Sequence, residues 1–277
     1  MMNPARLFIL CDNTAHAPDF GYEWGLSVAV RLPGGDLWLW DTGQTGLFLD
    51  NAKKFGLDLG QAKGLALSHG HYDHTGGLPF LLGRTSFSGS IFAHPKLGEK
   101  RYAVHPQTVA RFIGMDKETL PSPLPNFQGV PQTREIAPGL TFLTSIPRKP
   151  GLFQAVSGFY FDKQRNSPDL IEDDACLVLE TVAGPVLILG CCHSGLGNTM
   201  SQVRDALGLS SLFAVLGGMH LASAPDSALE EAVQFLKDFD VRQVFPGHCT
   251  GREAAAYLKK RLPGRVFDLG AGRVLDF

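Results

Sequence analysis

The segment LALSHGHYDHTGGL, residues 65–78, places three histidines and an aspartate within six positions, directly after an apolar run typical of a strand. These residues are His69, His71, Asp73 and His74. Imidazole and carboxylate groups are the usual ligands of zinc and related ions, and their alternation in an extended loop directs side chains to two sides of a centre. Histidines that only capped a strand would repel one another when protonated and need partners when buried. The segment therefore predicts a site for one or two metal ions.

Several short aliphatic runs end in a similar way, at a polar side chain, and most of them have a glycine at that end. They cover residues 36–43, 64–68, 185–190, 211–218 and 241–247. Each is typical of a strand buried on both faces. The polar residues at their ends are Asp41, His69, His193 with Cys191 and Cys192, His220, and His248. Because α/β proteins build sites on loops at strand ends, we expect five strands to deliver these side chains to one rim.

Amphipathic helices are predicted between the strands, over residues 46–56, 198–208, 225–239 and 251–262. Strands interleaved with such helices indicate layered sheets covered by helices. Residues 84–170 are rich in proline and glycine and are interpreted as an irregular insertion of loops and extended cover. We find no linker, so residues 1–277 are expected to form one domain.

Composition limits the class of protein. The chain has 277 residues, 44% hydrophobic and 19% charged, with a formal net charge of −2, which is ordinary for a globular protein and offers no broad attraction for nucleic acid or membranes. The N-terminal apolar segment is too short for a signal peptide, so a cytoplasmic location is expected. Five cysteines without a disulfide or zinc-knuckle spacing are interpreted as reduced thiols, with packing favoured over metal ligation.

The motif SHGHYDHTGGL resembles the signature of the metallo-β-lactamase superfamily, and DTGQTGLFLDNAKKFGLDL resembles the segment that leads into it. CDNTAHA, EWGLSVAV, GCCHSG, LGGMHL and PGHCTG resemble a branch grouped with a 7,8-dihydropterin ribofuranosylaminobenzene-phosphate synthase. The resemblance implies an αββα four-layer sandwich of the α+β class with metals at the sheet edges.

The resemblance also implies a ligand set. His69 and His71 would bind one metal, and Asp73 and His74 the second. His248 would match the last ligand motif. His193 would supply the remaining ligand position at the first metal or lie between the two metals. No Gly-Asp pair follows residues 185–190, so the identity of the residue that replaces the bridging carboxylate of the commoner pattern is left open. Asp174 and Cys191 are the alternatives, although Glu172, Asp173 and Asp174 are interpreted first as a solvated acidic turn.

Other residues receive roles around the metals. His220 is predicted to face the substrate, with direct ligation as the second choice, and Asp73 to orient water or pass its proton. Asp41 is predicted to hold a ligand imidazole. Asn13, Arg148 and Lys149 are candidate substrate-binding residues, because an amide can polarise a substrate and a basic pair can clamp a phosphate. Surface charge without a ligand is the alternative for the basic pair.

These observations lead to three functional hypotheses. The first is a hydrolase that attacks a phosphate ester, a diester or a similar small electrophile with metal-bound hydroxide, since a metal lowers the pKa of bound water to about 7. The second is a pterin and ribose-phosphate synthase or transferase, and the third a non-enzymatic metal or ligand sensor. Zinc, as one or two ions, is the expected cofactor, and manganese and iron suit the same ligands. The expected partner is a small molecule, with no nucleic acid or membrane, and the oligomeric state is open.

Overall fold

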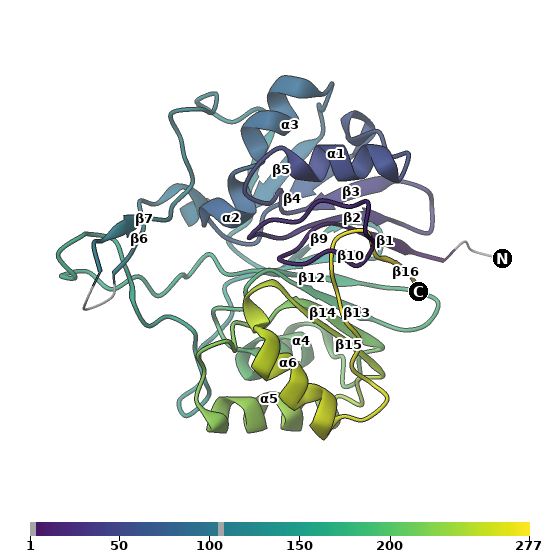
Figure 1. Ribbon diagram of the computed structural model, residues 1–277, viewed down its shortest axis with the longest axis vertical. Helices are drawn as coiled ribbons and strands as arrows, with labels where there is room; N and C mark the ends of the chain where they lie inside the picture. Colours follow the sequence, from purple (N-terminus) through teal and green to yellow (C-terminus); the bar gives the residue numbers. More distant parts are fainter. Residues whose placement is uncertain (1–3, 105–107) are drawn as a thin grey trace.

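Two twisted sheets pack face to face, and helices cover the outer side of each, in the computed structural model, which describes residues 4–104 and 108–277 (Figure 1). The first sheet has the order β16-β1-β2-β3-β4-β5-β8. Its strands are β1 (Arg6–Cys11), β2 (Ser27–Arg31), β3 (Leu37–Trp40), β4 (Gly64–Ala66), β5 (Ser90–Ala93), β8 (Phe127–Gly129) and β16 (Val274–Asp276). Strands β3, β4, β5 and β8 run parallel, so their carboxyl ends share one rim.

The second sheet has the order β15-β14-β13-β12-β10-β9. Its strands are β9 (Arg134–Ala137), β10 (Leu140–Leu143), β12 (Cys176–Leu179), β13 (Val186–Leu189), β14 (Ala214–Gly218) and β15 (Gln243–Gly247). Strands β13, β14 and β15 are parallel to one another. A small third sheet joins β6 (Tyr102–Ala103), β7 (Arg111–Phe112) and β11 (Phe159–Tyr160), and β6 and β7 project beside the sandwich (Figure 1).

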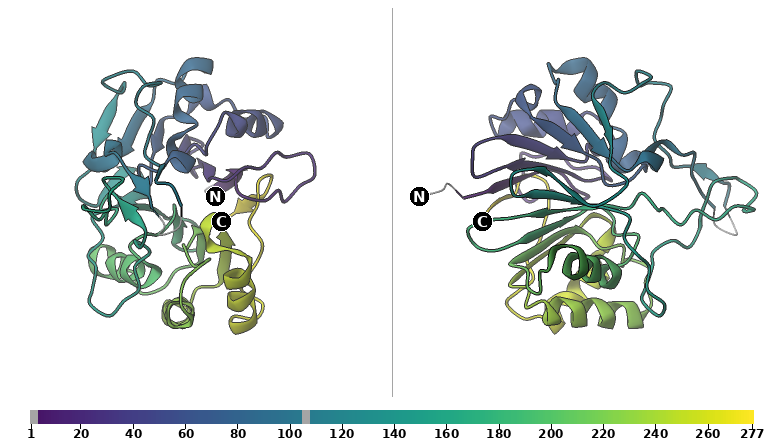
Figure 2. Two further views of the ribbon diagram at one scale, coloured as in Figure 1. Left: turned by 60° about the vertical axis from the view of Figure 1, so that its left-hand side comes forward. Right: turned by 180° about the vertical axis from the view of Figure 1, so that it is seen from behind.

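The helices divide between the two outer faces. Those of the first half are α1 (Leu47–Lys54), α2 (Tyr72–Thr75) and α3 (Leu78–Arg84), and those of the second half are α4 (Leu196–Leu207), α5 (Asp226–Asp238) and α6 (Arg252–Arg261). Short 3-10 helices are η1 (Leu59–Gln61), η2 (Pro95–Gly98) and η3 (His248–Thr250). Figure 2 shows α4, α5 and α6 on the side opposite to α1 and α3. The four-layer αββα sandwich is thereby confirmed.

Apolar side chains fill the three spaces between the layers. The central core lies between the sheets and includes Ile9, Val28, Trp40, Phe142 and Ile188, all fully buried. The indole of Trp40 on β3 also donates a hydrogen bond to the carbonyl of Leu189 on β13, at 3.1 Å. This bond satisfies a polar group inside the core and ties together two strands whose ends carry site residues.

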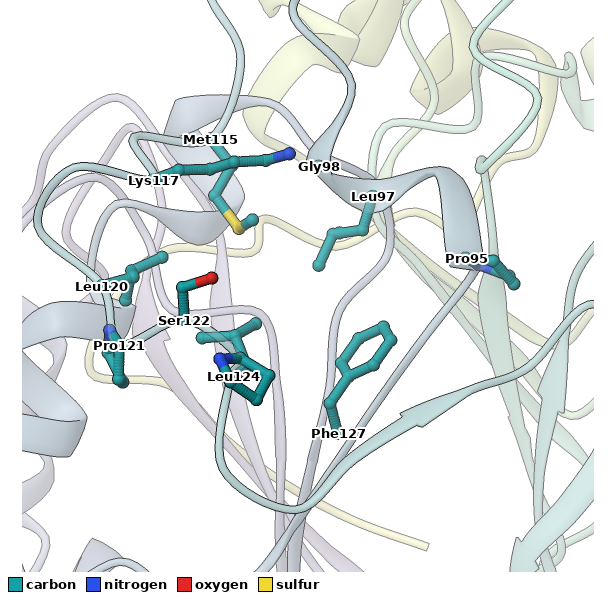
Figure 3. A pocket seen from close by; sticks show the side chains of 11 residues that line it. Pro95, Leu97, Gly98, Met115, Lys117, Leu120, Pro121, Ser122, Leu124 and Phe127 are labelled. Atoms are coloured by element: carbon teal, nitrogen blue, oxygen red, sulfur yellow. The ribbon is translucent and has the colours of Figure 1, made fainter.

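The segment expected to be irregular supplies strands to both main sheets. Strands β5 and β8 extend the first sheet, and β9 and β10 extend the second. They are three or four residues long, too short for a period-two pattern to stand out between the prolines. The remainder of residues 84–170 is loop-rich, and it contains an apolar pocket where Leu97, Met115, Leu124 and Phe127 face one another (Figure 3). Among the described residues, no helix combines the length and apolar character that crossing a bilayer requires.

Candidate metal centre

The polar residues at the strand ends meet at the rim shared by the two sheets. Asp41 follows β3, and His69, His71, Asp73 and His74 follow β4 in the first sheet. Cys191 and His193 follow β13, His220 follows β14 and His248 follows β15 in the second sheet. All of them except the half-buried His220 are buried. The centre is therefore assembled from both halves of the chain.

Backbone strain marks the points where the strands turn into the centre. Asp41, Cys192, His220 and His248 all have left-handed backbones, with φ between 47° and 59°. Such a conformation costs of the order of 1–3 kcal/mol for a residue with a Cβ, and it persists only when the surroundings impose it. Gly190 lets the β13 end approach β4, since a Cβ there would lie 2.4 Å from the Ser68 side chain. The strand ends are thus held in sharp, close turns around the site.

Hydrogen bonds to Nδ1 fix the tautomers of four imidazoles. His74 Nδ1 donates to Asp41 Oδ2, and His193 Nδ1 donates to the Ala155 carbonyl, both at 2.7 Å. His248 Nδ1 donates to Asn13 Oδ1 at 2.9 Å. Because Ser68 Oγ gives its own hydrogen to Asp41 Oδ2, it accepts one from His69 Nδ1 at 2.9 Å. These assignments follow from the hydrogen-bond network and place the Nδ1 proton outward on all four rings.

The Nε2 atoms of the same rings point inward and converge. His74 Nε2 lies 3.2 Å from His248 Nε2, and His69 Nε2 lies 3.0 Å from His71 Nδ1. Within the part of the chain that the structure describes, three groups of ligand atoms converge, and the atoms within each group all lie within 4.8 Å of one another. The groups are His69, Cys191 and His193; His74, Cys191 and His248; and Cys191, His220 and Cys249. Among the described residues, His71 Nε2 and His193 Nε2 are buried without a hydrogen-bond partner. Converging lone pairs and unpartnered buried nitrogens suit a divalent metal, so the residues fit the ions that the sequence predicts.

The charge states of the candidate ligands agree with metal binding. Burial lowers the pKa of His69, His71 and His193 well below the usual value, because a charged ring loses its hydration. Burial alone would raise the pKa of Asp73, but His74 and His248 lower it well below its usual range. The centre therefore combines the neutral imidazoles of His69, His71 and His193 with the ionised carboxylate of Asp73.

The pKa of His248 differs from that of these three histidines. Burial lowers its pKa, but Cys249 and Asp73 outweigh this effect and raise it to about 9. Its Nε2 lies 3.4 Å from Asp73 Oδ2, so the protonated ring forms an ion pair with this carboxylate. A metal that uses this nitrogen has to displace that proton.

The turn between the first two histidines rests on a buried ion-pair network. Gly70 N donates to Asp173 Oδ2 at 2.8 Å, and Asp173 Oδ1 pairs with Arg101 Nη1 at 2.7 Å. Arg101 Nε also faces Asp169 Oδ2 at 3.3 Å, and all three side chains are fully buried. Asp174 is buried as well and accepts a hydrogen bond from Ser194 N at 2.7 Å. The interpretation of Asp173 and Asp174 as a solvated turn is wrong, because Arg101 and backbone amides compensate their charge inside the fold.

The candidate substrate residues occupy different settings. Asn13 is engaged on both sides of its amide, since Oδ1 accepts from His248 Nδ1 and from Gly25 N, and Nδ2 donates to the His248 carbonyl. Arg148 donates to the Ile171 carbonyl, and the exposed Lys149 pairs with Asp205 at 2.9 Å. Asn13 thus lies against a ring of the centre, whereas Arg148 and Lys149 have partners in the surrounding loops.

His220 lies beside the centre next to aromatic and sulfur groups. Its ring centroid is 4.4 Å from that of His193, and its ligand atom lies within 4.8 Å of Cys191 and Cys249 Sγ. Its Nδ1 is buried without a hydrogen-bond partner among the described residues. Burial alone would lower the pKa of His220, but the neighbouring Cys249 raises it above the usual value.

Two aromatic residues border the histidines. Trp24 is 53% exposed, donates to Asp73 Oδ2 at 2.9 Å and lies 5.4 Å from the His248 ring. Phe159 on β11 lies 5.3 Å from the rings of both His71 and His193. Sequence reasoning missed Trp24, because a single tryptophan in a loop carries no spacing that connects it with Asp73.

Several known proteins resemble this chain in sequence. The family model described as "Metallo-beta-lactamase superfamily" matches residues 25–194, more than half of the chain. A 7,8-dihydropterin-6-methyl-4-(β-D-ribofuranosyl)-aminobenzene-5'-phosphate synthase of Methanocaldococcus jannaschii is 27% identical, over 77% of this chain and 74% of the relative. An uncharacterized protein of the same organism is 30% identical, over 91% of this chain and 93% of its own length.

A solved structure resembles almost the whole chain. The crystal structure of Tm1679, described as a metal-dependent hydrolase of the β-lactamase superfamily, is 30% identical, covers 99% of both chains and superposes with a TM-score of 0.84. Members of the superfamily generally bind divalent metals, which agrees with the converging donors at the rim. The chain belongs to the metallo-β-lactamase superfamily.

Proposed function

We propose that this protein is a metal-dependent hydrolase of phosphate esters, phosphodiesters or similar small electrophiles. The observation that carries the proposal is the set of four rings whose Nδ1 protons are committed to outward acceptors, which leaves their Nε2 lone pairs directed at one centre. The similarity to a metal-dependent hydrolase over the whole chain supports it.

The chemistry of such a site divides between the ions and the chain. When bound, divalent ions activate water and stabilise charge on oxygen atoms. Asp73 stays ionised and is oriented by the Trp24 indole, so its Oδ2 can accept a proton from the attacking water. His220 Nδ1 is free of partners among the described residues, so it can donate a proton to the leaving oxygen. The proposed roles thus supply one proton acceptor and one proton donor.

The ligand set favours an anionic substrate. The proposed ligands His69, His71, His74, His193 and His248 are neutral when they bind a metal, and Asp73 adds one negative charge, so a centre with two divalent ions keeps a net positive charge. Such a centre attracts phosphate oxygens and stabilises the charge that develops on them. Trp24 and Phe159 supply apolar surface beside the metals, which suits an organic group attached to the phosphate.

The test combines metal analysis with turnover. Purified protein is analysed for metal by mass spectrometry and assayed on phosphomonoesters, phosphodiesters and lactones, before and after chelation. We expect bound metal, hydrolysis that chelation abolishes, and at least a hundredfold loss in His71→Ala. His16→Ala is the matched control, because His16 is exposed. Protein without bound metal, or a His71→Ala variant of unchanged activity, contradicts the proposal.

The second candidate function is a synthase or transferase acting on a pterin and a ribose phosphate. The synthase name of the M. jannaschii relative favours it. It predicts a product only when both organic substrates are supplied together, whereas a hydrolase turns over one substrate in water alone. Parallel incubations with each substrate separately and with both distinguish the two functions.

A further inference from the structure

We infer that the thiolate of Cys191 bridges the two metal positions of the centre. The inference rests on the metal-binding part of the proposed function and identifies the group that links the ions. In the commoner sequence pattern of the superfamily, the bridging residue is an aspartate that follows a glycine. In this chain, Gly190 is followed by Cys191. A sulfur bridge changes both the metal preference and the spectroscopic signature of the site.

The position of the Cys191 sulfur carries the argument. It belongs to all three groups of close ligand atoms, whereas His69 and His193 occur only in the first and His74 and His248 only in the second. Its Sγ lies 3.1 Å from His74 Nε2, and the side chain is 2% exposed. A donor shared by two otherwise separate imidazole groups is in the place that a bridging ligand requires.

The adjacent thiol is turned away from the centre. Cys192 has φ 59°, and its Sγ lies 3.4 Å from the hydroxyl of Thr199 on α4. It packs in the core between the second sheet and its helices, with Leu196 and Met200. The two consecutive cysteines therefore have different surroundings, and Cys192 is a matched internal control for Cys191.

The other candidates for the bridge are placed less favourably. Asp174 Oδ2 accepts the hydrogen bond of Ser194 N, and although Asp174 Oδ1 is buried without a partner among the described residues, Asp174 belongs to none of the groups of close ligand atoms. Cys249 Sγ lies 3.6 Å from the Cys191 carbonyl and belongs to a third group with His220 and Cys191. Only Cys191 occurs in all three groups of the described residues.

The chemistry of sulfur suits the role. When two cations approach, the thiol loses its proton to solvent, and the resulting thiolate has lone pairs for both ions. Thiolate is a soft donor that favours zinc and cobalt over magnesium and calcium. We therefore expect the site to select soft or borderline divalent ions.

Cobalt spectroscopy tests the bridge directly. The full-length protein is loaded with Co²⁺, the ions are counted by mass spectrometry, and the sulfur-to-cobalt charge-transfer band is recorded in the near ultraviolet. We expect two ions and the band in the wild type, in Cys192→Ala and in Cys249→Ala. Cys191→Ala should lose the band and its second ion, and Cys191→Asp should bind two ions without the band. Circular dichroism verifies the fold of each variant.

The wild-type spectrum separates the two proposals even where a variant fails to fold. Two bound ions and hydrolytic turnover without a charge-transfer band overturn the bridge and leave the proposed function standing. A band that persists in folded Cys191→Ala or Cys191→Asp also overturns the bridge. Wild-type protein that binds neither cobalt nor any other divalent ion overturns the proposed function, and the bridge with it.

Discussion

Replacing Asp41 with asparagine tests how the centre is held. The Asp41 carboxylate is fully buried and accepts three hydrogen bonds of 2.7 Å, from Ser68 N, Ser68 Oγ and His74 Nδ1. Asparagine has the same shape but only one acceptor oxygen. If that oxygen stays on Ser68 N, the amide NH₂ faces Ser68 Oγ and His74 Nδ1, which are both donors. His74 then has to accept at Nδ1 and carry its proton on Nε2, the nitrogen that points into the centre.

The expected magnitude follows from that change of tautomer. Loss of a carboxylate that orients a ligand imidazole typically lowers metal affinity by about 10- to 100-fold, or about 1.4–2.7 kcal/mol. We expect a loss of this size for Asp41→Asn, measured as zinc affinity by competition with a chromophoric chelator. Asp36→Asn is the control, because Asp36 is exposed at the other end of the same strand. An Asp41→Asn variant with native circular dichroism and unchanged zinc affinity would refute the tautomer argument.

Three further predictions concern the surroundings of the centre. Arg101→Met should lower the free energy of unfolding by about 3–5 kcal/mol in urea denaturation, because Asp169 and Asp173 lose their buried counter-charge; a change below about 1 kcal/mol contradicts this. Zinc affinity should rise at least tenfold per pH unit from about pH 7 to about pH 9, since the metal displaces the proton of His248, whose pKa is raised to about 9, and the loss of the Cys191 thiol proton makes the slope steeper. Calorimetry that detects no proton release contradicts this prediction. Trp24→Phe should lower turnover about tenfold without changing the free energy of unfolding, because Asp73 loses its indole donor. Stopped-assay kinetics measure the turnover, and urea denaturation measures the free energy of unfolding.

The sequence predicted the elements that are long or clearly bounded. Strand β4 and the ligands after it were evident, because an apolar run ends one residue before closely spaced histidines. Helices α4 and α5 were predicted to within about two residues at each end, since their apolar positions repeat over three turns. Strands β9 and β10 were not predicted, because their pairing, rather than their composition, makes them strands.

The sequence could not reveal which polar groups are compensated by distant partners. The run of acidic residues 172–174 is typical of a solvated turn, and only the fold brings the buried Arg101 against Asp173. Thiols are typically packed in cores, so the sequence favoured packing for Cys191 as it did for Cys192. Their different surroundings depend on the left-handed backbone at Cys192, which no residue pattern indicates.

The centre exists only when the two sheets have closed on each other. His248 follows β15 in the second sheet, and its backbone N donates a hydrogen bond of 2.7 Å to Asp12, which follows β1 in the first sheet. Likewise, the Sγ of Cys191, which follows β13, contacts His74 Nε2, and Asp41 at the end of β3 accepts a hydrogen bond from His74 Nδ1. The Trp40 indole joins these two strands through the core. Because ligands of both sheets must be in place before an ion is held, metal binding stabilises the closed sandwich by mass action, and a change that separates the sheets weakens metal affinity without altering a ligand.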